Sequence, residues 1–425
     1  MNGKNKDLDN YTRVGLGQID MGAYEYTLAS PDKNGIIYVD SSKNGIGDSW
    51  ANAVTEFADA LHTARFDTSV HEIWVAKGNY FPKYYAQDGF SKTICITTPN
   101  PPQYSFVLPK NVKIYGGFAG GENDLSLRNH SINKTILNGN NETDYITTDD
   151  AYNVVVSIGD VGTTELNGFE IINGKAILPL VSETINSITI SRGKGGGIQF
   201  INSSPKIIYC NISKNTSYTG GAISITNGYP SFTNCIFSGN ESSTWGIITA
   251  NTCLSSFINF YNCLITGNKS NNSLIESINS KIKFTNATIA NNYLTAVTPY
   301  FIDIGTSNLN PDFYLNNCII WGNTFTPDLY VSTSFGNSVA SNNSILPSYI
   351  PAGQIFGSGN IISNTPQFVT PLPLSSTPKI GGDYHVQPCS VALNMGDSLL
   401  IPNEVNSDLE INPRIKYYNV DIGAY

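Results

Sequence analysis

Apolar and polar positions follow a short repeating pattern between residues 195 and 323. Brief runs in which apolar residues alternate with polar ones, such as residues 206–209 and 281–284, are separated by corners rich in Gly and Asn, and no helical spacing lies between them. Alternation of this kind, bounded by Gly and Asn, predicts short β-strands that end in tight turns. The pattern therefore indicates all-β structure.

Copies of the pattern can be aligned on one small residue that is followed five positions later by Asn. They are residues 209–215, 234–240, 262–268, 286–292 and 317–323, and the small residue advances by 25, 28, 24 and 31 positions from copy to copy. Such a period without helices is typical of a parallel β-helix, in which each coil pairs its strands with the coils on either side. We predict a β-solenoid with three strands per coil and a rise of about 4.8 Å per coil.

The same alignment predicts two columns of side chains along the coils. One column is inward-facing and contains Cys210, Cys235, Cys263, Ala287 and Cys318. The other lies at a corner and contains Asn215, Asn240, Asn268, Asn292 and Asn323, whose amides can hydrogen-bond up and down the stack. The chain has seven Cys but no CxxC pair, so the thiols are interpreted as packing groups, with no zinc site and no disulfide framework.

Helical spacing appears near the N-terminus. Asp48 and Ser49 provide an N-cap, and apolar residues follow at positions 50, 53, 54, 57, 58, 61 and 64. Because the open end of a solenoid exposes its core and its strand edges, we expect this helix to cap the first coils within residues 30–110. Further coils are expected through residues 111–364.

Residues 7–24 and 408–425 are two copies of one motif. The identical pairs are Asp7/Asp408, Leu8/Leu409, Arg13/Arg414, Asp20/Asp421, Gly22/Gly423, Ala23/Ala424 and Tyr24/Tyr425. We expect residues 1–29 to be the tail of a preceding repeat unit or an N-terminal extension, and residues 365–425 to be a C-terminal module that ends in the DIGAY motif. In the alternative, both copies belong to one unit, pack on its opposite ends and exchange between chains to build a filament.

Composition excludes several classes of protein. Only 13% of the residues are charged, 40% are hydrophobic, and the chain contains 50 Asn and 38 Gly, which fits neither a disordered chain nor a long coiled coil. The net charge is −9, and no stripe of Lys and Arg offsets it, so nucleic acid is not an expected partner. No run approaches the roughly 18 apolar residues of a spanning helix, so no membrane insertion is expected within this segment.

Several sequence blocks occur in a characteristic order: IYVDSSKNGIGDSWANAVTEFADAL, EIWVAKGNY, VKIYGGFAGGE, LNGFEIINGK and, near the end, GDYHVQPCSVALNMGD and VDIGAY. This order resembles that of right-handed parallel β-helix surface proteins of the Bacteroidetes type. The GGAI of residues 220–223 and the FxxN of residues 237–240 are similar to the repeats of polymorphic outer-membrane-protein adhesins. The resemblance implies right-handed coils, an extracellular or cell-surface location, and adhesion.

Polysaccharide lyases and hydrolases share this scaffold, and they need paired carboxylates, or a base beside a group that neutralises the substrate. In residues 195–325 the acids and bases are scarce and are predicted to recur at no matched coil position. The loop of residues 173–197 interrupts the coil rhythm, and it contains the candidate catalytic residues Glu183, Arg192 and Lys194. The sequence therefore favours a protein that is not an enzyme.

Tyr218, Trp245 and Trp321 lie near predicted coil corners, where exposed rings could stack on sugars. Packing at the corners is the simpler interpretation of these rings. They are the candidate ligand-binding residues.

No cofactor and no metal site are indicated, and Ca²⁺ has only weak support. Oxygen-bearing side chains gather in the loop from Asp40 to Asp48 and in the two terminal motif copies, at Asp7, Asp9, Asp408 and Glu410. Asp, Asn and Gly in such loops usually serve as turns.

Three hypotheses about function follow. The leading one is an extracellular structural or adhesive β-helix segment of a tandem-repeat surface protein, with glycans or other surface proteins as partners. The first alternative is a polysaccharide lyase or glycoside hydrolase that acts in a lateral groove near residues 173–197. The second alternative is a subunit that self-associates end to end in a filament.

Overall fold

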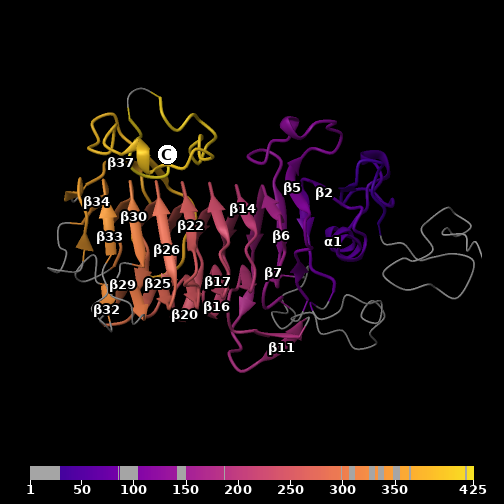
Figure 1. Cartoon of the computed structure of the whole chain (residues 1–425), viewed down its shortest axis with the longest axis horizontal. Coiled ribbons are helices and arrows are strands. Elements are labelled where there is room, and N and C mark those ends of the chain that lie inside the picture. The colour runs from indigo at the N-terminus through magenta and orange to yellow at the C-terminus, as the bar shows by residue number, and fades with distance from the viewer. Residues whose placement is uncertain are drawn as a thin grey trace, which may run out of the picture.

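The computed structural model describes residues 29–84, 86, 104–140, 150–185, 187–297, 299–305, 312–324, 331–333, 339–347, 355–362, 365–416 and 419–425. The predicted tail at residues 1–28, with its motif copy at residues 7–24, and Cys95 lie outside these residues. Within them, short strands stack along the long axis of an elongated body (Figure 1). Neighbouring strands in the four stacked sheets are parallel, which confirms the predicted parallel β-helix.

Two of the sheets run along nearly the whole rod. Sheet I contains β1 (Ile36–Val39), β2 (Glu72–Ala76), β5 (Lys113–Phe118), β8 (Glu165–Asn167), β14 (Lys206–Ile208), β18 (Ser231–Thr233), β22 (Phe257–Tyr261), β26 (Lys281–Thr285), β30 (Phe313–Asn316), β33 (Val339–Asn342) and β35 (Ile355–Phe356). Sheet II contains β3 (Gly78–Tyr80), β6 (Thr135–Asn138), β9 (Phe169–Ile172), β15 (Asn211–Ser213), β19 (Ile236–Ser238), β23 (Leu264–Thr266), β27 (Thr288–Ala290), β31 (Ile319–Trp321), β34 (Ile345–Leu346) and β36 (Ile361–Ile362).

The remaining side of each central coil is made of two sheets instead of one. Sheet III contains β10 (Lys175–Ala176), β16 (Thr216–Thr219), β20 (Glu241–Trp245), β24 (Lys269–Ser270) and β28 (Tyr293–Leu294). Sheet IV contains β4 (Phe106–Val107), β7 (Val155–Ile158), β13 (Ile198–Ile201), β17 (Ile223–Thr226), β21 (Ile248–Asn251), β25 (Ser273–Ile278), β29 (Tyr300–Gly305) and β32 (Val331–Thr333). The central coils therefore have four short strands, one more than predicted.

Glycines divide sheet III from sheet IV. Gly220 and Gly246 have φ of +71° and +53°, a left-handed backbone that bends the chain between the two sheets. The strands of sheet III are polar, as in Thr216–Thr219, so they lack the apolar alternation by which a strand is recognised in a sequence.

The two predicted columns are present. The Cys and Ala side chains of the first column are at most 1% exposed. The Asn column forms a continuous amide ladder: each Nδ2 donates to the Oδ1 of the next Asn, at 3.0 Å from Asn215 to Asn240, 3.0 Å from Asn240 to Asn268, 2.9 Å from Asn268 to Asn292 and 2.9 Å from Asn292 to Asn323. Burial raises the pKa of the Cys318 thiol to about 12, so this sulfur is a packing group.

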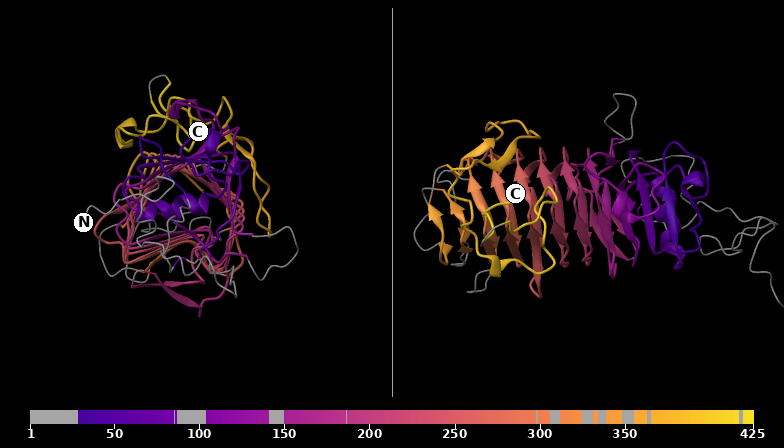
Figure 2. Two further views of the ribbon diagram at one scale, coloured as in Figure 1. Left: turned by 90° about the vertical axis from the view of Figure 1, so that its right-hand side faces the viewer. Right: turned by 90° about the horizontal axis from the view of Figure 1, so that it is seen from above.

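Helix α1 (Phe57–Phe66) covers the N-terminal end of the coils (Figure 2). Phe57 is fully buried and contacts the rings of Tyr80, Phe106 and Phe169. The prediction of a helix starting at Ser49 was only partly right. Ser49 caps a short 3₁₀ helix, η1 (Trp50–Asn52), and the backbone is then extended at Val54, which pairs with Val39.

The C-terminal module folds back along the side of the rod (Figures 1 and 2). It contains a hairpin of β37 (Phe368–Thr370) and β38 (Asp383–Val386) and a 3₁₀ helix, η5 (Ser398–Leu400). Outside this module, another 3₁₀ helix, η4 (Leu125–Leu127), precedes β6. The module packs Phe368, Tyr384 and Ala424 onto outward-facing apolar residues of sheet II. The second motif copy therefore packs on the side of the coils, and not on a coil end as the alternative interpretation of the two copies required.

Candidate functional site

The predicted loop at residues 173–197 is an inserted hairpin, β11 (Ser182–Ile185) and β12 (Ile188–Ser191), at the lower edge of the rod in Figure 1. Its inward residues Ile185 and Ile190 pack on Val156 and Ile201 of sheet IV. Hairpin residues thus alternate between a buried face on the rod, which includes Glu183, and a more exposed polar face.

Two of the three candidate catalytic residues are buried under this hairpin. Glu183 and Arg192 form an ion pair, and their side chains are 2% and 0% exposed. Arg192 also donates to Oδ1 of Asn153 at 2.9 Å, and Asn153 donates to the carbonyls of Lys194 and Gly195 at 2.6 and 2.8 Å. These contacts attach the insertion to the coil. Both charged groups are buried, so neither is accessible to a substrate.

Lys194 lies apart from that pair, at the corner between sheets III and IV. Its backbone bridges to Thr219, and Thr219 is in turn the register partner of Trp245. Lys194, Thr219 and Trp245 therefore form a row across three successive coils. Lys194 and Trp245 are partly exposed, whereas Thr219 is buried.

A second row lies beside the first on the outer face of sheet IV. Register pairing places Ser224 next to Thr249, Thr249 next to Glu276, and Glu276 next to Asp303. Glu276 and Asp303 are partly exposed carboxylates on adjacent strands, so their Cα atoms are about 4.8 Å apart. The prediction that acids and bases recur at no matched coil position is wrong for this pair. It is also wrong for Glu241 and Lys269, which are register partners and form an ion pair at 2.6 Å.

The surroundings of Glu276 favour its protonated form. Burial and the neighbouring charge of Asp303 raise the pKa of Glu276 to about 7, and Lys194 opposes that shift. At neutral pH a substantial fraction of Glu276 is therefore protonated, beside a second carboxylate and an amine.

Gly246 brings the backbone of the Trp245 row close to the backbone of Glu276. A Cβ atom on Gly246 would lie 3.2 Å from the backbone nitrogen of Glu276, so the glycine permits this close approach. Tyr218, 40% exposed, precedes Thr219 on the same sheet. We call the group of Lys194, Trp245, Glu276 and Asp303 the corner site.

Trp321 lies elsewhere, next to the C-terminal module. Its ring meets that of Phe368 edge-to-face, with centroids 5.6 Å apart, within the apolar contact between sheet II and the module. The three aromatic candidates are therefore not brought together.

The loops considered for Ca²⁺ use their carboxylates in turns. Oδ1 of Asp40 accepts from the backbone nitrogen of Ser42 at 2.9 Å, and Oδ1 of Asp408 accepts from the backbone nitrogens of Glu410 and Asn412, each at 2.9 Å. Asp7 and Asp9 lie outside the described residues. The described residues contain no group of three or more His, Cys, Asp and Glu side chains placed to hold a metal ion.

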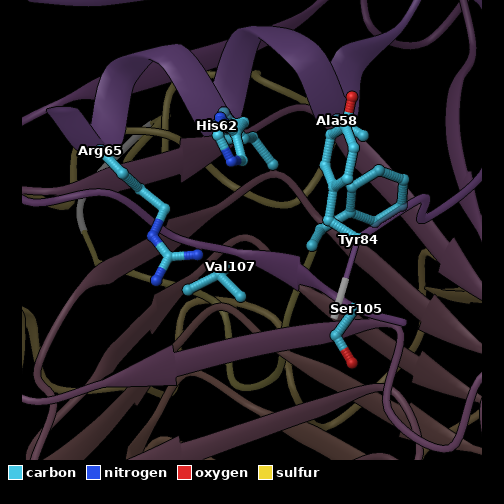
Figure 3. A pocket seen from close by; sticks show the side chains of 8 residues that line it. Ala58, His62, Arg65, Tyr84, Ser105 and Val107 are labelled. Atoms are coloured by element: carbon cyan, nitrogen blue, oxygen red, sulfur yellow. The ribbon is translucent and has the colours of Figure 1, made fainter. Parts of the chain in front are cut away.

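A small cavity lies under the capping helix (Figure 3). His62 and Arg65 point from the helix towards Val107, and the cavity volume is about 20 Å³, which is room for about one water molecule. It is too small for an organic ligand. Among the described helices, none is long and apolar enough to cross a membrane.

Comparison with known proteins gives structural likenesses at low identity. The pectate lyase Pel9A has a TM-score of 0.46 and 12% identity, and the alignment covers 94% of this chain and 98% of that chain. The pectin methylesterase PemA from Erwinia chrysanthemi has a TM-score of 0.29 and 10% identity, with 77% and 81% covered. The catalytic domain of a GH87 α-1,3-glucanase in complex with nigerose has a TM-score of 0.21 and 11% identity, with 76% and 61% covered.

No family model matches the sequence. No curated protein matches it either. Because the structural likenesses have such low identities and TM-scores, they carry no argument about activity. Function has to be inferred from the site itself.

Proposed function

We propose that the chain is an extracellular adhesive β-helix rod that binds glycan chains at the corner site. The observation that supports this is that the partly exposed Trp245 and the partly exposed pair Glu276 and Asp303 lie on successive coils at one corner, where Gly246 approaches the backbone of Glu276. An aromatic face can stack on the apolar face of a sugar ring, and nearby carboxylates and an amine can hydrogen-bond its hydroxyl groups. Polar groups placed around an aromatic ring are a common arrangement in ligand sites.

The spacing of the site also suits a polymer. Successive coils repeat every 4.8 Å or so along the rod, a distance comparable to the length of one sugar ring. A glycan chain aligned with the rod axis would meet one coil per sugar, with Lys194, Trp245, Glu276 and Asp303 on different coils.

Affinity electrophoresis in gels that contain xyloglucan, laminarin or pullulan tests this proposal. We expect at least one of these polymers to retard the full chain, and Trp245→Ala to remove the retardation. Phe356→Ala is the matched control, because Phe356 is an aromatic residue that is 57% exposed near the C-terminal end of the coils. If no polymer retards the wild type, or if both variants bind alike, the corner site does not bind glycans.

Glycoside hydrolysis is a second candidate function, favoured by the raised pKa of Glu276. Glycosidases pair a protonated carboxyl group with a second carboxylate, which is about 5–5.5 Å away in retaining enzymes. Glu276 would act as the acid and Asp303 as the partner. Release of reducing ends by the wild type, with loss in Glu276→Gln and retained binding, would establish hydrolysis; absence of release by the wild type would exclude it for the polymers tested.

A further inference from the structure

The outer face of sheet I, which follows sheet IV in each coil, carries a cluster of lysine and aromatic side chains. Phe257 on β22 is the register partner of Lys281 on β26, and Lys283 on β26 is the register partner of Tyr314 on β30. All four residues are partly exposed and point away from the core. We call them the lysine–aromatic platform.

The rings hold the two ammonium groups in place. The Lys283 nitrogen lies 4.5 Å from the centroid of the Phe257 ring and 5.6 Å from that of Tyr314, and the Lys281 nitrogen lies 5.9 Å from Phe257. Phe257 and Tyr314 contact each other edge-to-face at 5.3 Å. Contacts between ammonium groups and ring faces restrict the lysine side chains but leave their charge in place.

No carboxylate neutralises these lysines in the part of the chain that the structure describes, where neither forms an ion pair. Lys113, in the same row of sheet I, differs because its register partners are Glu72 and Glu165. Further along the row, Lys206 is also a register partner of Glu165. Near the platform, burial and Glu404 of the C-terminal module raise the pKa of Tyr261. In a chain of net charge −9, the platform is a local positive surface.

The row continues along the rod. Register partners lead from Lys283 through Asn259 and Ser231 to Lys206, three strand spacings or about 14 Å away, where Glu165 is the next register partner. The two residues between them, Asn259 and Ser231, are polar and partly exposed. A stiff polymer with an anionic group on its sugars can follow such a row, whereas a compact acidic protein would need a more complementary surface.

We propose that the lysine–aromatic platform is a second binding site, for acidic polysaccharides. Carboxylate or sulfate groups of the polymer would meet Lys281 and Lys283. The rings lower the entropy that the lysines lose on binding, because the ammonium groups are already positioned. This site does not depend on the corner site.

Binding of the full chain to polygalacturonate and to heparin, measured by biolayer interferometry at several salt concentrations, tests the proposal. We expect Lys281→Ala/Lys283→Ala to weaken binding about tenfold and to flatten its salt dependence, since two surface ion contacts are lost. Lys113→Ala is the matched control and should bind like the wild type. Phe257→Ala should weaken binding while all lysines remain.

Three results would overturn the proposal: no binding by the wild type, equal binding by the double variant and by Lys113→Ala, or equal binding of polyglutamate and polygalacturonate. Loss of acidic-polymer binding in Trp245→Ala but not in the double variant would place the ligand at the corner site instead. Failure of neutral-glycan binding, by contrast, would affect only the proposed function.

Discussion

The Asn ladder offers a sharp test of what stabilises the rod. Replacing Asn268 by Ala removes four hydrogen bonds: its Nδ2 donates to the carbonyl of Phe237 at 2.9 Å and to Asn292 at 2.9 Å, and its Oδ1 accepts from the backbone nitrogen and Nδ2 of Asn240 at 2.9 and 3.0 Å. Asn268 is only 1% exposed, so water cannot replace these bonds. Its φ is not positive, so Ala fits the backbone.

The expected cost follows from these contacts. A typical intramolecular hydrogen bond contributes about 1 kcal/mol net, and a buried donor left without a partner costs more, so the free energy of unfolding should fall by roughly 3–5 kcal/mol. Asn268→Asp should cost at least as much, because a carboxylate cannot donate and would be buried with its charge. Asn259→Ala is the control, since Asn259 is partly exposed and donates one bond, to the carbonyl of Phe257 at 3.2 Å.

Urea unfolding followed by far-UV circular dichroism measures these differences. The control should lose less than about 1 kcal/mol. If Asn268→Ala and Asn259→Ala differ by less than that, the amide ladder does not stabilise the coils in the way described.

Three other predictions concern the cap, the insertion and the C-terminal module. Burial lowers the pKa of His62 from 6.5 to about 4, so between pH 6.5 and 4 the unfolded chain binds a proton that the folded chain does not bind. The free energy of unfolding should therefore fall by about 2–3 kcal/mol across that window. In urea titrations at pH 7 and pH 4.5, His62→Phe should lose less stability than the wild type. Arg192→Ala should lower the free energy of unfolding in urea by roughly 3 kcal/mol, because it leaves Glu183 buried without its partner. Retardation of the folded variant by glycans should stay unchanged. A loss of retardation would show that the ion pair takes part in glycan binding. A chain ending at residue 364 should bind the dye ANS and aggregate, since the apolar stripe of sheet II is uncovered, and a monodisperse truncated chain would show that the module is dispensable.

The coil repeat could be predicted because its determinants recur at nearly constant spacing. The Cys or Ala residue and the Asn residue occupy the same positions in each copy of the repeat, so one alignment predicted both columns. Because the columns require the copies to stack in register, the same alignment predicted the path of the backbone in each coil. Sheet III escaped prediction because a polar strand such as Thr216–Thr219 resembles a loop in sequence.

The corner site was missed for a different reason. Glu276 and Asp303 become neighbours only when the coils are placed in register, and their coils differ in length, which hides the match. The useful signal is local: Ile275–Glu276–Ser277 and Ile302–Asp303–Ile304 both place an acid between two inward positions. Aligning the strands one sheet at a time would have paired them.

The lateral docking of the C-terminal module also left a trace in the sequence. Leu264 and Ile265, like Ile319 and Ile320, are consecutive apolar residues. In β15, by contrast, the apolar Ile212 lies between polar Asn211 and Ser213. Consecutive apolar residues mark a strand buried on both faces. The module itself has no periodicity, so its course over sheet II could not be predicted.

Hydrogen–deuterium exchange of the full chain, with and without the best-binding neutral polysaccharide, tests the central claim most directly. If the corner site binds glycans, the polymer should slow exchange in β20, β21, β25 and β29, around Trp245, Glu276 and Asp303, and leave sheet II unchanged. Protection confined to other sheets, or no protection with any of the polymers, would contradict glycan binding at the corner site.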